Sequence, residues 1–113
     1  MSRFTILETD QFLADVEESA VWILESNLEQ SENLAIRKVD DFQNEIETLK
    51  ERLKDFPESG ESDIIKGVRK FPVYSGRYSV KWVVQKTDKL INLIALSDSK
   101  YPKALRNIQL EDL

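Results

Sequence analysis

The spacing of apolar residues changes period in the middle of the chain, and this change restricts the folds open to it. Over residues 12–56, apolar side chains recur every three or four positions, the spacing of amphipathic helices. From about residue 64 they alternate with polar ones, the spacing of half-buried strands. The segment FPESG at 56–60 separates the two patterns. The sequence therefore predicts a helical part followed by a sheet part.

The helical part follows a short predicted strand over residues 3–8, RFTILE, in which apolar and polar residues alternate. Thr9 or Asp10 can then cap a first helix that ends between Asn27 and Gln30. Its apolar stripe consists of Phe12, Val16, Ala20 and Ile23, widened by Leu13 and Leu24.

A second helix, which Ser31 can cap, has the strongest periodicity in the chain. The short connection favours folding back on the first helix, with a dimeric coiled coil as the alternative. Pro57 and Gly60 end the helix, because proline lacks the amide that a helix needs. Its apolar positions are Ala35, Val39, Phe42, Ile46, Leu49, Leu53 and Phe56.

Three strands are expected in the sheet part. Residues 68–73 form one, and Pro72 places its end at a sheet edge or a bulge. After a turn at Ser75 and Gly76, residues 78–85 form the clearest strand, and 90–96 is apolar enough to lie in the middle of the sheet, covered on both faces or nearly so. A short helix containing Ala104, Leu105 and Ile108 can close the chain. The predicted class is α+β, a helical hairpin packed on an antiparallel sheet.

At 113 residues, the chain has the length of one domain, and we expect a single domain over 1–113. It contains no cysteine and no histidine, which excludes disulfides, Cys-His and Ser-His-Asp catalysis and most zinc sites. We expect no metal site and no cofactor, because no metal-ligand spacing or glycine-rich phosphate loop occurs. No secretory signal or bilayer-spanning apolar stretch is evident, so we expect a cytoplasmic protein.

Charge is divided between the two parts. Residues 1–63 carry 17 acidic and 6 basic side chains, whereas residues 64–113 carry 4 acidic and 10 basic ones, and the net charge is −5. A local basic surface can attract an anionic partner. The alternative is that both parts are solvated surfaces that keep the protein soluble.

Basic residues of the second half are interleaved with aromatic ones, a pattern that suits single-stranded RNA. Arg69, Arg77 and Lys81 are the candidate binding residues. Strand alternation sends Lys81 to the face opposite Tyr78 and Trp82, so these aromatics are expected in the core. We expect the Arg and Lys side chains on the free side of the sheet, and Asp98 as a turn or capping residue. The full set of these basic residues is Lys66, Arg69, Lys70, Arg77, Lys81, Lys100, Lys103 and Arg106, and the interleaved aromatic residues are Tyr74, Tyr78, Trp82 and Tyr101.

Three runs carry a resemblance to the RelE/ParE toxin superfamily. FTILETDQFLADVEESAVWILESN resembles its first strand and helix, LKERLKDFPESG its second helix and the break after it, and GVRKFPVYSGRYSVKWVVQKTDKLINLIAL its strand meander. The resemblance covers nearly the whole chain and implies the toxin of a type II toxin–antitoxin pair, held inactive by an antitoxin that wraps it. RelE-like members cleave messenger RNA on the ribosome, whereas ParE-like members act on DNA gyrase.

By position, Arg69 and Arg77 match strand arginines of the superfamily, and Lys100 and Tyr101 match its basic and aromatic residues after the last strand. These four are the catalytic candidates if the protein is a nuclease. Ser79 stands where many members have arginine, and Ser97 to Ser99 where basic residues or histidine are common. The departures favour a ParE-like or degenerate member, and we expect a toxin that binds its target. The alternatives are a RelE-like messenger RNA endoribonuclease and a non-toxic interaction module.

Overall fold

The computed structural model describes residues 3–99. Lys100, Tyr101 and the expected closing helix lie outside the described residues. The elements in chain order are β1 (Thr5–Glu8), α1 (Asp10–Leu28), α2 (Glu32–Asp55), β2 (Glu61–Ser62), β3 (Arg69–Val73), β4 (Tyr78–Gln85) and β5 (Leu90–Asp98).

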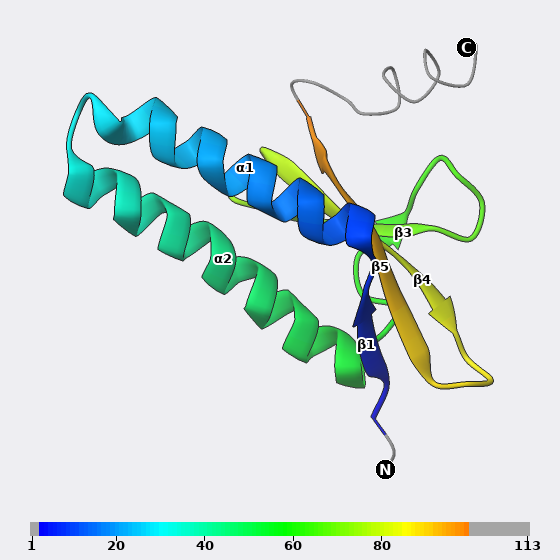
Figure 1. The fold of residues 1–113 in the computed structure, drawn as a ribbon. Coiled ribbons are helices and arrows are strands. Elements are labelled where there is room, and N and C mark those ends of the chain that lie inside the picture. The colour runs from blue at the N-terminus through cyan, green and yellow to red at the C-terminus, as the bar shows by residue number, and fades with distance from the viewer. Residues whose placement is uncertain (1–2, 100–113) are drawn as a thin grey trace.

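The helices pack against each other as a hairpin on one face of a five-stranded sheet, as Figure 1 shows. The strand order is β1-β5-β4-β3-β2, with β1 parallel to β5 and every other pair antiparallel. The expected α+β hairpin-on-sheet architecture is confirmed, and folding back is the correct alternative for the second helix. Within residues 3–99, neither helix is long and apolar enough to cross a membrane.

Both helices begin at the expected caps. The Thr9 side chain accepts a hydrogen bond from the amide of Phe12 at 3.2 Å, and the Ser31 side chain accepts one from the amide of Leu34 at 3.3 Å. The expected apolar role of Phe56 is wrong: α2 ends at Asp55, and Phe56 caps its C-terminus with 65% of its surface exposed. The helix stops one residue too early to carry this ring into the core.

The core lies between the hairpin and the sheet. Tyr78 and Trp82 of β4 are buried, which confirms that these aromatics are structural. Phe42 of α2 packs on Tyr78 with ring centroids 5.3 Å apart. The indole of Trp82 donates a hydrogen bond to the carbonyl of Pro57 at 2.8 Å, which fixes the end of the hairpin on the sheet.

Strand β5 is central, as expected, because β1 and β4 flank it. Its burial is one-sided: Ile91, Leu93 and Leu96 are buried, and the residues between them are only half-buried. A register shift lets both Leu93 and Leu96 face the core although they are three positions apart, since Lys81 pairs with Ala95 and Trp82 with Leu93. Because the bulge shifts which positions face the core, the apolar residues of β5 do not follow a strict alternation in the sequence.

The sheet edges show what the sequence did not predict. At one edge β2 pairs with Arg69 and Lys70 of β3, so Pro72 lies beyond this short pairing, as expected for a proline at an edge. At the other edge β1 is tied to α2, because the amide of Phe4 donates to the carbonyl of Lys54 and Lys50 pairs with Glu8 at 2.9 Å. The spacing of apolar residues predicted neither the pairing of β1 nor the existence of β2.

Candidate functional site

Arg69 lies at the start of β3 and reaches back to the segment after α2. Its guanidinium donates hydrogen bonds to the carbonyls of Ser59 at 3.4 Å and Gly60 at 3.1 Å. Its register partner is the buried Trp82, and register partners share one face of a sheet. Arg69 therefore lies on the hairpin side, not on the free side where we expected it.

Arg77 lies just before β4 and forms a two-point ion pair. Its Nε and Nη2 atoms donate to the two carboxylate oxygens of Asp98 at 3.0 and 3.3 Å. The guanidinium also lies 4.4 Å from the ring centre of Trp22 in α1. Asp98 is thus a β5 residue that pairs with a cation, and its expected role as a turn or capping residue is wrong.

Lys81 lies on the free face of the sheet, opposite the core aromatics, as expected. Its ammonium is 3.2 Å from a carboxylate oxygen of Asp63, and its register partner Lys70 is 3.8 Å from the other oxygen. Lys70 also lies 4.0 Å from Glu61. The two lysines thus share one carboxylate, with only 5% of the Asp63 side chain exposed.

The described candidates are not gathered at one point. Arg69 and Arg77 are separated by the length of β4 from Tyr78 to Trp82, which corresponds to roughly 15 Å along a strand. Burial raises the pKa of both Tyr74 and Tyr78, and the nearby Arg77 opposes this rise. These phenols therefore stay protonated near neutral pH. In residues 3–99, no group of acidic side chains is arranged to hold a metal ion.

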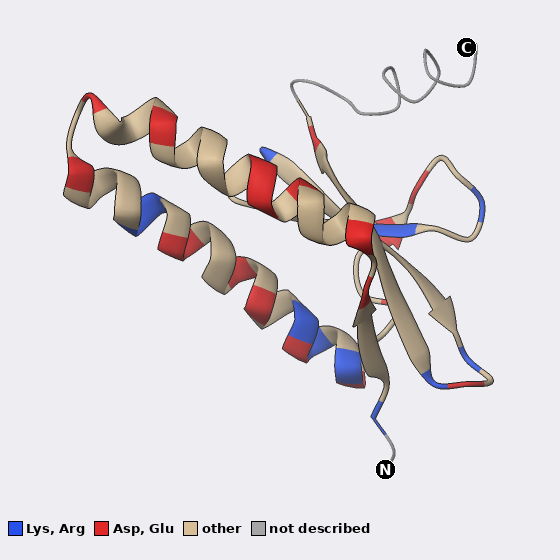
Figure 2. Ribbon diagram, viewed as in Figure 1, with Lys and Arg blue, Asp and Glu red and all other residues tan. Residues whose placement is uncertain are grey.

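The two halves of the molecule carry opposite charge (Figure 2). From Asp10 to Asp55, the hairpin has 13 acidic and 5 basic side chains, whereas residues 64–99 have 2 acidic and 7 basic ones. The charge division in the sequence is therefore a division between the hairpin and the part of the sheet formed by β3, β4 and β5.

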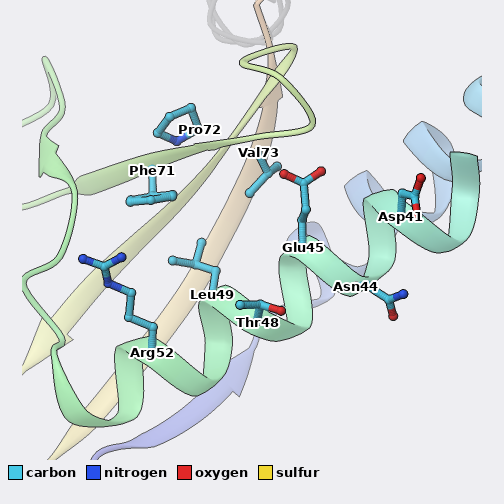
Figure 3. Close-up of a pocket in the computed structure, with 9 residues that line it drawn as sticks. All are labelled: Asp41, Asn44, Glu45, Thr48, Leu49, Arg52, Phe71, Pro72 and Val73. Carbon is cyan, nitrogen blue, oxygen red and sulfur yellow. The ribbon is translucent and has the colours of Figure 1, made fainter.

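A groove of about 600 Å³ runs between α2 and β3 (Figure 3). Leu49 and Val73 are the buried residues of its apolar floor, and the ring of Phe71 extends this floor. Arg52 lies over Phe71 at 5.7 Å from the ring centre. The full lining is Asp41, Asn44, Glu45, Thr48, Leu49, Arg52, Phe71, Pro72 and Val73.

The ends of this groove differ in charge. Asp41 and Glu45 lie at one end, and Arg52 lies at the other (Figure 3). Asp41 also borders a second hollow of about 650 Å³ beside the β3–β4 turn, lined in part by Lys38, Tyr74 and Arg77. The two hollows share Asp41 as a lining residue, and we refer to them together as the trough. Its apolar floor between α2 and β3 suits an extended or helical segment with apolar side chains.

The β3 edge inside the groove does not offer amides for an added strand. Pro72 has no amide hydrogen, and the amide of Tyr74 donates to both carboxylate oxygens of Glu45 at 3.1 Å. An α2 carboxylate thus occupies the place that a neighbouring strand would take. We therefore expect a partner in this groove to bind mainly through its side chains. No sequence pattern predicted that Glu45 would accept a hydrogen bond from the amide of Tyr74.

Comparison with known proteins supports the fold. No protein-family model matches the sequence, and a search of curated proteins finds no match. Among solved structures, the chain is similar to one from the "Chromosomal ParDE TA system from P. aeruginosa", with a TM-score of 0.60 and 17% sequence identity. The similarity covers 84% of this chain and 95% of that chain. The RelE/ParE-like fold that the sequence resemblance implies is therefore confirmed.

Proposed function

We propose that this protein is the toxin component of a type II toxin–antitoxin pair, that it acts in the cytoplasm by binding its target, and that a cognate antitoxin neutralises it. The observation that carries the proposal is the likeness to a chain of the ParDE system, which extends over nearly all of that chain. DNA gyrase is the target that the ParE-like reading implies.

The placement of the cations favours binding over catalysis. Cleavage of RNA needs groups that move protons and cations that stabilise one charged transition state. Arg69 and Arg77 lie roughly 15 Å apart along the sheet. Each is also engaged within the chain, Arg69 by backbone carbonyls and Arg77 by Asp98. This arrangement supports a toxin that acts by contact.

Induced expression in a bacterial host separates the candidate functions. Growth arrest with a DNA-damage response is the outcome expected for the gyrase-binding toxin. Growth arrest with breakage of messenger RNA would instead support the endoribonuclease, whose candidate residues are Arg69, Arg77, Lys100 and Tyr101. Normal growth at confirmed expression would leave an interaction module and would overturn the toxin proposal.

The trough beside α2 and β3 is the place we assign to the antitoxin, because its apolar floor and charged ends fit a side-chain-mediated partner. The probe is the product of the small open reading frame expected beside the gene. Thr48→Arg and Asn44→Arg place a long charged side chain in the groove, and both residues are exposed. We expect these variants to remain toxic and to escape rescue by that product.

A matched variant controls for the added charge. Gln43→Arg adds the same side chain to an exposed position of α2 outside the groove lining. Rescue should be unchanged for this variant. If the product rescues Thr48→Arg and Asn44→Arg as well as it rescues Gln43→Arg, the antitoxin binds elsewhere.

A further inference from the structure

The loop between β2 and β3 places an acidic side chain over two lysines of the free sheet face. Asp63 lies between Lys81 at 3.2 Å and Lys70 at 3.8 Å, and its carboxylate is almost wholly covered. The lysine side chains keep 22% and 32% of their surface exposed. The lysines therefore form an anion site on the sheet, and a carboxylate of the same chain fills it.

The loop that supplies this carboxylate has few attachments to the sheet. The two-residue pairing of β2 and the ion pairs of Asp63 with the two lysines attach it to the sheet. Within the loop, the Asp63 amide donates to the Val68 carbonyl at 2.8 Å and the Val68 amide to the Ile65 carbonyl at 3.2 Å. Gly60 and Gly67, with φ of +79° and +86°, bracket it. Figure 1 shows the loop projecting on the side of the sheet away from the helices.

The tip of the same loop exposes two large apolar side chains. Ile64 is 97% exposed and Ile65 is 61% exposed, although water disfavours such exposure. Lys66 follows them directly. An apolar tip beside a lysine pair matches a protein partner with acidic and apolar side chains better than it matches nucleic acid, which presents phosphates and bases and is recognised through planar side chains.

We propose that Lys70 and Lys81 form a binding site for a carboxylate of an acidic, apolar segment of a protein partner, and that Asp63 occupies the site until this partner displaces it. Ile64 and Ile65 then contact the apolar side chains of the same segment. The proposal extends beyond the toxin assignment and does not depend on it, because it rests on the lysines, their internal carboxylate and the exposed loop tip.

Displacement predicts that removal of the internal carboxylate strengthens binding. When a site is open in only a fraction of the molecules, its apparent Kd is the intrinsic Kd divided by that fraction, so binding is weaker. If the Asp63 pairing favours the closed form about five-fold, as one ion pair of ordinary strength does, Asp63→Asn should tighten binding about five-fold. The probe is a dye-labelled ten-residue peptide of eight glutamates and two leucines, followed by fluorescence anisotropy at low salt.

Matched variants separate the site from net charge and from folding. Asp88→Asn removes one exposed acidic charge in the β4–β5 turn and should leave the affinity nearly unchanged. In the Asp63→Asn protein, Lys70→Gln with Lys81→Gln should abolish the gain, and Ile64→Ser with Ile65→Ser should weaken binding of the leucine-containing peptide more than binding of decaglutamate. Circular dichroism melting checks that each variant folds.

Three results would overturn the proposal. Equal affinities of Asp63→Asn and Asp88→Asn would show that the carboxylate does not block the lysines. A larger gain for a ten-nucleotide RNA than for the peptide would make nucleic acid the ligand. Self-association of Asp63→Asn in sedimentation would make a second copy, with its acidic hairpin, the occupant. Growth assays of toxicity are independent of these measurements, so the two proposals can fail separately.

Discussion

The hairpin-covered face of the sheet and the β2–β3 loop use similar residues in opposite ways. Ile91 and Trp82 are fully buried under the helices, whereas Ile64 is almost fully exposed at the loop tip. Arg77 is held between Asp98 and Trp22, whereas Lys70 and Lys81 share the one carboxylate of Asp63. The covered face holds the fold together, and the loop is free to take part in recognition.

The largest effect should come from the covered face. Trp82→Ala removes a fully buried ring together with its hydrogen bond to Pro57, and we expect a loss of about 3–5 kcal/mol in the free energy of unfolding. Urea unfolding followed by circular dichroism measures this loss. A loss below about 1 kcal/mol would mean that the hairpin does not depend on this contact.

A smaller loss is expected at the edge of the covered face. Arg77→Ala removes a two-point ion pair and a contact with Trp22, and we expect a loss of about 1–2 kcal/mol. Asp98→Ala and the double variant complete a mutant cycle. Additive losses would show that Arg77 and Asp98 are not coupled. Any loss of toxicity in Arg77→Ala should be compared with this loss of stability.

Acid should weaken the attachment of the loop, because it protonates Asp63. Burial by itself raises the pKa of Asp63, but the hydrogen bond from Lys81, the amide of Ile64 and the charge of Lys70 outweigh it, so the pKa lies below its ordinary value. A lowered pKa in the folded state means stability that is present above about pH 4 and lost as the pH falls through the folded value.

The contribution of the Asp63 pairing should be about 1 kcal/mol, measured as the difference in unfolding free energy between pH 6 and pH 2 for the unchanged protein and for Asp63→Asn. Lys81 and Lys70 lie beside this carboxylate and Glu61 lies 4.0 Å from Lys70, so the comparison is made at constant ionic strength. An identical acid dependence of the two proteins would contradict the pairing.

The smallest effect on stability should come from the loop tip. Ile64→Ser with Ile65→Ser exposes no new apolar surface, and we expect a change within about 0.5 kcal/mol. Ile91→Ser, which places a hydroxyl in the core, serves as the buried counterpart and should be severely destabilising. If both substitutions destabilise to a similar degree, the loop tip packs against the molecule and the comparison fails.

The sequence predicted those features that depend on short-range patterns. Thr9 and Ser31 cap the helices because their side chains accept hydrogen bonds from nearby backbone amides. The alternation of residues in β4 correctly placed Trp82 on the core face and Lys81 on the opposite face. Pro72 marked an edge because a proline has no amide to pair. Each of these depends on neighbours within a few positions of the chain.

The features that were missed depend on residues that are distant in sequence. Asp98 pairs with Arg77 across 21 positions, and Glu45 meets the amide of Tyr74 across 29. Asp63 joins lysines of two different strands, and Gly60 fits against the carbonyl of Lys70 only because β2 folds back on β3. Spacing along the chain carries no signal for such contacts, so the sequence singled out candidate cations but did not predict which side chains they pair with.

Amide hydrogen exchange tests the division between a firm covered face and a displaceable loop most directly. The amides of β5, including that of Leu96, which donates to the buried Asp15, should exchange with the free energy of global unfolding. Those of Asp63 and Val68 should exchange much faster, through local opening of the loop, and faster still in Asp63→Asn. Equal protection of both sets would contradict the account, because the loop would then open only when the whole protein unfolds.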